Sequence, residues 1–370
     1  MSATKNITHV AGTFLVEAPA SFLNGAGLGE GENRNVTVPK TFRDGSNRVP
    51  YVSSQAWKRW LRNTLIEETG WPASELKAIG QSAKQTTAKI AGELDPVRFP
   101  EDDIFGYMRA ERGQGKRRSE NEETENSESE EVEEKGGKKV KPLIRASPFC
   151  ASILCSVRKT GWQGKDEGFV HLKEGTPLPY TTEFYNTHLQ GVFCLNYLRL
   201  GVFWNIGDRI ELDEAKIGGF LRDKKIKVIQ DQGKTGKVYE MTDAQTKRKE
   251  RASELLKALA RLRGGAKQAA FGTDVSPKVL ILAGTTCGNP IFNSLLIDDG
   301  SGPILKVDAL KEVARDYSDR IVTPIFVGIR KGYLKNEADV LKLDETKEAN
   351  AVFKVTTPID SAEQMAKALT

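Results

Sequence analysis

The sequence predicts an α+β fold built on one sheet and two crossing helices, in the ferredoxin-like order. Three observations lead to this prediction. The chain has 370 residues, of which 38% are hydrophobic, enough for a packed core. Its principal elements follow the order strand, helix, strand, strand, helix, strand. Segments of a different composition interrupt this order, which predicts insertions into the domain.

The first half supplies a strand and two predicted helices. Residues 6–18 alternate and are β-branched, as in a strand. The Gly- and Asn-rich residues 19–50 are expected to form a long loop. A helix is predicted over residues 54–69, with Ser53 or Ser54 as its N-cap and Gly70 at its end. A less regular helix is predicted over residues 73–91.

The second half of the chain supplies the remaining strands and helices of the ferredoxin-like order. It contains four apolar strands, an amphipathic helix that ends at two glycines, and a short terminal helix. The strands are predicted at residues 148–159, 188–204, 278–283 and 321–334, and the helices at residues 246–263 and 361–369. Because this order occurs in proteins of many functions, the function has to be argued from particular residues.

The charge distribution favours a polyanionic partner. The net charge is +5, but residues 119–134 hold nine glutamates and no lysine or arginine. Since that segment contributes −9, the rest of the chain carries +14. Residues 112–141 have almost no apolar side chains and are predicted to be a disordered acidic loop. A generally basic, solvated surface is the alternative explanation of the charge.

Nothing in the sequence predicts a membrane segment or a metal site. The longest apolar runs, such as residues 279–283, are far shorter than the roughly 20 residues that cross a bilayer. We therefore expect a cytoplasmic protein without membrane contact. The cysteines, which show no metal-ligand spacing, are expected to be reduced, buried and without zinc; they are Cys150, Cys155, Cys194 and Cys287.

The most informative stretch is residues 48–62. On a helix, four polar residues fall at positions i, i+3, i+4 and i+7 and form one stripe: Gln55, Lys58, Arg59 and Arg62. Trp57 and Trp60 take the opposite, core-facing side. The first turn adds Ser53, Ser54 and free backbone N–H groups, which predicts a phosphate cradle. A solvated basic face is the alternative.

Other segments could extend this cradle. The preceding loop contributes four polar residues, namely Asn24, Lys40, Arg43 and Arg48. Its glycine run, residues 25–31, leads toward Val-Thr-Val-Pro and not into a helix, which argues against a dinucleotide site. Lys267 and Gln268 follow two glycines and could donate to phosphates, although an ordinary helix end is equally consistent. Residues 175–190 could form a hairpin that presents the aromatic rings of Tyr180, Phe184 and Tyr185, or a surface loop with core anchors.

The sequence offers little for catalysis. It has no Ser-His-Asp, G-x-S-x-G or H-E-x-x-H pattern. No base is evident for the acidic pairs Asp102–Asp103 and Asp298–Asp299. His9 and His188 are expected to pack or to form hydrogen bonds, although a lone histidine could serve a metal-independent ribonuclease.

Several of these stretches together resemble the backbone subunit of type I Cascade complexes, in the RAMP superfamily, and within it the type I-B DevR autoregulator family. The most specific pair is Ser-Ser-Gln-x-x-Lys-Arg from Ser53 and Gly-x-Lys-Gln-x-x-Phe from Gly265. Ala-Pro-Ala-Ser-Phe-Leu-Asn from Ala18, Asp-Ile-Phe-Gly-Tyr-Met from Asp103, and the strands at residues 148–157 and from 191 follow in the family's order.

This resemblance implies a modified RNA-recognition (RRM-like) palm with a helical finger insertion and a thumb hairpin. The palm would comprise residues 1–69, 142–159 and 188–370, the fingers 70–141, and the thumb 160–187. Copies would stack head to tail along a CRISPR guide RNA, which then pairs with a target DNA strand beside other Cascade subunits. The implied palm contacts with RNA are Ser53, Ser54, Gln55, Lys58, Arg59, Lys267 and Gln268.

The resemblance implies no enzymatic activity and no cofactor. Two other functions stay open on the sequence. A RAMP-family endoribonuclease would use His9 or His188, or a metal-dependent aspartate such as Asp44 or Asp95. A DNA-binding regulator would bind one operator, but no helix-turn-helix pattern is evident.

Overall fold

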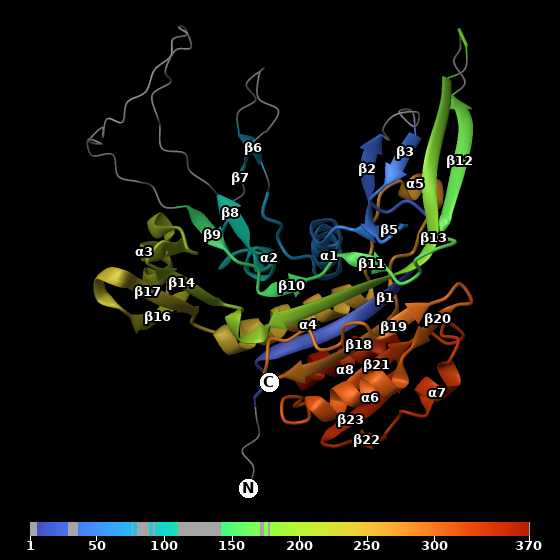
Figure 1. The fold of residues 1–370 in the computed structure, drawn as a ribbon. Helices are drawn as coiled ribbons and strands as arrows, with labels where there is room; N and C mark the ends of the chain where they lie inside the picture. Colours follow the sequence, from blue (N-terminus) through green and yellow to red (C-terminus); the bar gives the residue numbers. More distant parts are fainter. Residues whose placement is uncertain are drawn as a thin grey trace, which may run out of the picture.

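The structure is a computed structural model. It describes residues 6–28, 36–75, 77–79, 89–91, 93–109, 142–170, 174–176 and 178–369. The predicted disordered loop at residues 112–141 therefore lies outside the described residues. The described chain is a mixed α+β fold, as predicted, with a central sheet, a second sheet and a projecting two-stranded arm (Figure 1).

The central sheet has the predicted ferredoxin-like order. β1 (His9–Ser21) pairs antiparallel with β13 (Leu178–Asn196) and with β18 (Pro277–Thr285). β10 (Phe149–Ala151) and β11 (Leu154–Ser156) pair with the other edge of β13. Helix α1 (Ser54–Thr69) follows β1 in the chain, and α4 (Ala244–Ala260) connects β13 to β18. This is the split βαβ arrangement that the element order predicts.

Helices cover both faces of this sheet. On one face α1, α4 and α8 (Pro358–Ala368) bury a core that includes Phe14, Trp57 and Phe193. Trp57 is fully buried, its Nε1 donates to the Ser152 carbonyl at 2.7 Å, and its ring lies edge-on to Phe14. On the other face α6 (Val307–Asp316) and α7 (Glu337–Leu341) contribute to a second core. The prediction that Trp57 anchors α1 is confirmed.

The residues after β18, from 286 onward, extend the sheet, and we call them the C-terminal extension. β21 (Ile325–Ile329) pairs with β18, and β23 (Ala351–Thr356) pairs parallel with β21 and antiparallel with β22 (Lys347–Glu348). A hairpin of β19 (Leu296–Asp298) and β20 (Pro303–Leu305) belongs to this C-terminal extension. Figure 1 shows the hairpin below the base of the arm.

The arm is formed by β12 (Gln163–Val170) and the first half of β13, which pair from Gln163–Tyr185 to Val170–Leu178. Its place in the chain agrees with the expected thumb hairpin. Two further strands, β2 (Gly25–Leu28) and β3 (Val36–Pro39), pair with each other, and β3 runs parallel to β13. In Figure 1 the arm rises from the sheet beside β2 and β3.

A second, six-stranded sheet lies at the opposite end of the molecule (Figure 1). Its core is small and packs against α3 (Glu214–Arg222). The short helix α2 (Pro100–Phe105) precedes its first strand. The strands are β8 (Tyr107–Arg109), β9 (Leu143–Arg145), β14 (Val202–Ile206), β15 (Arg209–Ile210), β16 (Ile226–Asp231) and β17 (Gly236–Met241).

Four local predictions are wrong. Residues 19–50 contain strands β2 and β3, and then β4 (Thr41–Asp44) and β5 (Asn47–Val52), which turn at Gly45 with φ 61°. Residues 73–91 contain β6 (Lys77–Ile79) paired with β7 (Lys89–Ala91) where a helix was expected. The predicted strand 188–204 ends at Asn196 and resumes as β14 after a turn that includes Gly201, φ 73°, and 148–159 divides into β10 and β11. Pairing with distant strands, which local sequence does not report, decides these elements.

Two further findings concern the finger insertion and the cysteines. Among the described residues of the finger insertion, the only helix is the six-residue α2, and the strands there are the short β6, β7 and β8. Among the cysteines Cys194 is buried as expected, but Cys150 is exposed. None of the helices in the described part of the chain has the length and apolarity needed to cross a membrane.

Candidate nucleic-acid interface

The N-terminus of α1 presents unused hydrogen-bond donors at the surface. Ser53 caps the helix, because its Oγ accepts from Ala56 N at 3.4 Å. Asn24 Oδ1 in turn accepts from Ser53 N at 3.0 Å. The N–H groups of Ser54 and Gln55 have no acceptor among the described residues, and the first turn holds no acidic residue. This end of the helix can therefore donate to an anion.

The cations of the predicted α1 stripe have different environments. Arg59 is exposed, and the described part of the chain gives it no carboxylate partner. Lys58 is partly buried with Nζ 3.3 Å from Ser147 Oγ, and this burial lowers the pKa of its ammonium. Arg62 is only 16% exposed and forms an ion pair with Glu101. The structure thus corrects the prediction for Arg62, which joins α1 to α2 and does not reach the surface.

The loop at residues 263–267, between α4 and α5, reaches the same surface. Gly264 has φ 148° and lies against Trp60, whose ring a side chain at Gly264 would overlap. Next to it, Ala266 N donates to the Leu23 carbonyl at 2.9 Å. The close approach to Trp60 requires glycine at position 264. Together the two contacts place the start of α5 (Gln268–Phe271) beside α1.

Lys267 connects this surface to the arm. It is exposed, adopts φ 51°, and its Nζ donates to Thr182 Oγ1 on β13 at 2.7 Å. The same ammonium lies 5.1 Å from the centre of the Phe22 ring. Gln268 donates through Nε2 to the Gly264 carbonyl, which fixes the loop. The predicted pair Lys267 and Gln268 is therefore adjacent to α1 and to the arm.

The residues of the preceding segment are only partly brought together. Lys40 lies beside Asn24, because its N–H donates to the Asn24 carbonyl at 2.8 Å. Arg43 is exposed on β4, and Arg48 forms an ion pair with Glu183 at 3.0 Å. We call the contiguous set the α1 surface; it comprises Asn24, Lys40, Ser53, Ser54, Gln55, Lys58, Arg59, Lys267 and Gln268.

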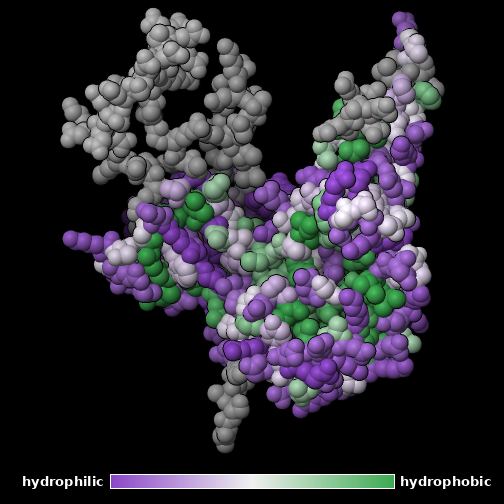
Figure 2. Space-filling view, in the orientation of Figure 1, coloured by the Kyte–Doolittle hydropathy of each residue, from purple (hydrophilic) through white to green (hydrophobic). Residues whose placement is uncertain are grey.

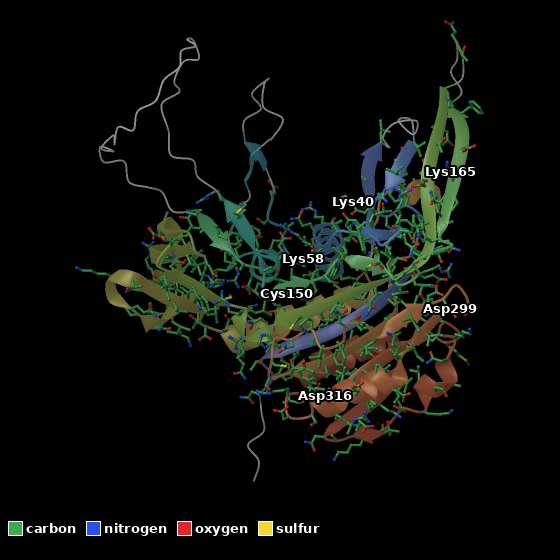
Figure 3. The ribbon with its side chains drawn as sticks, viewed as in Figure 1. Lys40, Lys58, Cys150, Lys165, Asp299 and Asp316 are labelled. Carbon is green, nitrogen blue, oxygen red and sulfur yellow. The ribbon has the colours of Figure 1, made fainter. Side chains whose placement is uncertain are left out.

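The α1 surface lies between the two ends of the molecule. Figure 3 places Lys58 low between the arm and the second sheet, Lys40 nearer the arm, and Lys165 on the arm itself. Figure 2 shows the arm standing above the rest of the described surface. The α1 surface lies at the foot of the arm and carries cations and N–H donors.

The three predicted aromatic residues of the arm lie in different surroundings. Tyr180 is 44% exposed, whereas Tyr185 is fully buried and its hydroxyl accepts from Leu23 N at 3.1 Å. The Phe184 ring packs 5.9 Å from that of Phe271. Tyr185 is therefore a core anchor, which was one of the two alternatives for this segment, and its ring is not presented on the arm. Phe169, which the sequence analysis did not select, is 64% exposed on the arm.

Both acidic pairs have cationic partners that sequence reasoning missed. Asp103 on α2 forms ion pairs with Arg145 and with Arg251, and all three side chains are at most 2% exposed. Asp298 pairs with Arg158, with Nη2 and Oδ2 2.8 Å apart. No local pattern in the sequence points to these pairs, since the partners are far apart in the chain.

The two histidines lie too far apart to act in one site. In the β1–β13 ladder His9 faces Asn196, whereas His188 faces Glu17. Eight residues of strand, or about 27 Å, separate these positions. Of the aspartates considered for a nuclease, Asp44 pairs with Lys159 at 2.7 Å, and Asp95 accepts from backbone N–H groups. Among the described residues no group of His, Cys, Asp and Glu is arranged to hold a metal ion.

The histidines should make stability depend on pH. Burial lowers the pKa of His9 and of His188 below the ordinary 6.5. As pH falls through 6.5, the unfolded chain takes up protons that the folded chain does not, so the free energy of unfolding should decrease. Above 6.5 the histidines add no pH dependence.

Urea unfolding of the parent and of His188→Gln at pH 7.5 and pH 5.5 measures this effect. The parent should lose more stability than the variant over that interval, since glutamine does not titrate. Equal losses in the two proteins would contradict a lowered pKa for His188.

The fold and the surface together define an RRM-like α+β protein with a cationic surface at the foot of a projecting arm. No family model matches the chain, and no curated protein matches it in sequence. Among solved structures, a chain of a CRISPR RNA-guided surveillance complex covers 98% of this chain and 100% of its own length, with 15% identity and a TM-score of 0.51. A chain of such a complex in a pre-nicking state has the same coverage, 14% identity and a TM-score of 0.54. These similarities concern the fold.

Proposed function

We propose that this chain is an RNA-binding backbone subunit of a type I, I-B-like, Cascade effector, and that several copies coat one CRISPR guide RNA. The observation that carries the proposal is the α1 surface, where donors from three distant segments meet at the foot of the arm. The similarity to chains of CRISPR RNA-guided surveillance complexes over nearly the whole chain supports the same assignment.

The chemistry of the α1 surface favours phosphates over bases. Helix-end N–H groups, three lysines and an arginine are donors that match phosphate oxygens and do not discriminate between bases. A protein that coats any guide needs this indifference to sequence. The exposed bases would then pair with a target DNA strand, so that the RNA supplies the specificity. Further copies and other Cascade subunits would complete the complex in the cytoplasm.

No catalytic role is part of this proposal. The chain would hold RNA by electrostatic contacts, and a protomer that neutralises about four phosphates should show a slope of about −2.8 in log affinity against log salt concentration. Salt-insensitive binding, or strong preference for one RNA sequence, would contradict the mechanism.

Co-expression with a guide RNA tests the function. After purification, native mass spectrometry and electron microscopy should find several copies of the chain on one intact RNA. A monomer bound to shortened RNA would instead support a RAMP-family nuclease, and cleavage lost in His9→Ala or His188→Ala would identify its base. Tight binding to duplex DNA at one operator, with no RNA bound, would support a regulator.

A further inference from the structure

The arm is joined to the central sheet by two stretches of chain that lie side by side. Arg158 precedes β12, and His188 lies where β13 passes from the arm into the sheet. Val157 N donates to the His188 carbonyl at 2.9 Å, and the Ser156 and Thr187 hydroxyls lie 2.5 Å apart. Both stretches are therefore in contact at the arm base, where they could bend together.

One carboxylate of the C-terminal extension contacts both stretches. Asp298 Oδ2 accepts from Arg158 Nε at 2.9 Å and lies 2.8 Å from Arg158 Nη2. The same oxygen lies 3.5 Å from His188 Nε2. Because Asp298 ends β19, outside the ferredoxin-like core, the β19–β20 hairpin holds the arm from below (Figure 1).

The Asp298 carboxylate is itself held rigidly. Its side chain is fully buried, while those of Arg158 and His188 are 15% and 12% exposed. The other oxygen, Oδ1, accepts from Gly300 N at 2.8 Å and from Gly302 N at 3.2 Å. Burial acts to raise the pKa of Asp298, but these bonds and the Arg158 guanidinium outweigh it, so that the pKa lies below its usual value. Asp298 is thus an ionised, oriented acceptor at neutral pH.

The extension makes a second contact with the arm base. The Tyr333 hydroxyl and His188 Nδ1 lie 2.6 Å apart, and the two rings meet edge to face at 5.5 Å. Asn336 fixes the hairpin to the Tyr333 segment, since its amide exchanges two hydrogen bonds with the Leu305 backbone. The hairpin and the Tyr333 segment therefore form one support beneath the arm.

We propose that Asp298 is a positioning residue through which the C-terminal extension sets the orientation of the arm relative to the sheet. Without it, Arg158 is left partly buried with no carboxylate partner among the described residues, and His188 keeps the Tyr333 hydroxyl but loses the Asp298 carboxylate. The contacts between the two stretches of the arm base remain, as do those of β13 with β3, Arg48 and Lys267, so the arm stays folded while its orientation loses the restraint from the C-terminal extension. Asp298, which lies outside the arm, thereby controls the position of the far end of the arm.

Spin-label distance measurements on the RNA-free chain test the proposal. Labels would replace Lys165 on the arm and Asp316 on α6, which Figure 3 places far apart, in a background with the more accessible native cysteines changed to serine: Cys150, Cys155 and Cys287. The parent should give one narrow distance distribution. Asp298→Ala should lose this narrow distribution and give a broad one.

The neighbouring aspartate provides a matched control. Asp299 is exposed and accepts hydrogen bonds only from Ser301 among the described residues, so Asp299→Ala should keep the narrow distribution. If Asp298→Ala does not fold, Asp298→Asn keeps the size of the side chain and an oxygen for Gly300 N while it removes the charge. A narrow distribution in Asp298→Asn would overturn the proposal.

The consequence for assembly rests on the proposed function, whereas the arm orientation does not. If copies meet through their arms on one RNA, Asp298→Asn should keep the parent's affinity for an RNA long enough for a single copy and lose the multi-copy assembly. A parent chain that binds no guide RNA would refute the proposed function and leave the distance measurement to decide the role of Asp298.

Discussion

Replacing Asp103 by alanine is expected to destabilise the chain by about 3–5 kcal/mol, since the change leaves buried charges without a partner. Asp103 accepts from Arg145 and Arg251, whose side chains are 0% and 2% exposed. Its Oδ2 also accepts from Gly201 N at 2.9 Å. Among the described residues, one substitution thus leaves the Arg251 guanidinium without a carboxylate, takes one of two carboxylates from Arg145, and leaves the Gly201 N–H without this acceptor.

The location of Asp103 explains why the loss of stability should affect both sheets. The carboxylate lies on α2, Arg145 on β9 of the second sheet, and Arg251 on α4 of the central core. Arg145 also pairs with the buried Glu211, with Nη1 and Oε2 3.1 Å apart. Because domains are stable by only about 5–15 kcal/mol, the expected loss is a large share of the total.

Urea unfolding followed by circular dichroism measures this loss as a lower midpoint. Asp319→Ala is the matched control, because Asp319 pairs with Arg320 where both side chains are more than half exposed. An exposed pair of this kind should leave the midpoint unchanged within error. Equal midpoints for Asp103→Ala and the parent would show that the buried pairs contribute no net stability.

The second large effect is expected for charge reversal on the α1 surface. Changing Lys58, Arg59 and Lys267 to glutamate removes three cations that we place against phosphates. If each contact contributes about 1 kcal/mol or more, the affinity for guide RNA should fall by about a hundredfold or more. The slope of log affinity against log salt concentration should become shallower by about 2, since about 0.7 is lost per phosphate contact.

The control for this experiment has the same change in net charge at the other end of the molecule. Lys331, Lys342 and Lys347 are exposed in the C-terminal extension, and changing all three to glutamate should leave most of the affinity. Fluorescence anisotropy with a labelled guide RNA at several salt concentrations gives both quantities. Equal losses for the two triple variants would mean that net charge, and not the α1 surface, governs binding.

The sequence by itself determined the order of the main elements and the position of α1. Hydrophobic periodicity is a local property, so β1, α1, α4 and β18 could be located from residues that are neighbours in the chain. The same periodicity placed Trp57 in the core and Gln55 and Arg59 on the outside. Ser53 and Gly70 marked the helix ends, because capping needs particular residue types.

Only the tertiary structure decided which charged residues are free to contact a ligand at the surface and which are used in ion pairs within the protein. Arg62 belongs to the α1 stripe by spacing, yet Glu101 removes it from the surface, whereas Lys267 reaches α1 from 200 residues away. Asp103 and Asp298 likewise meet arginines from distant strands and helices. An ion pair depends on where separate elements pack, and periodicity in one segment carries no information about the charges that another segment will bring to it.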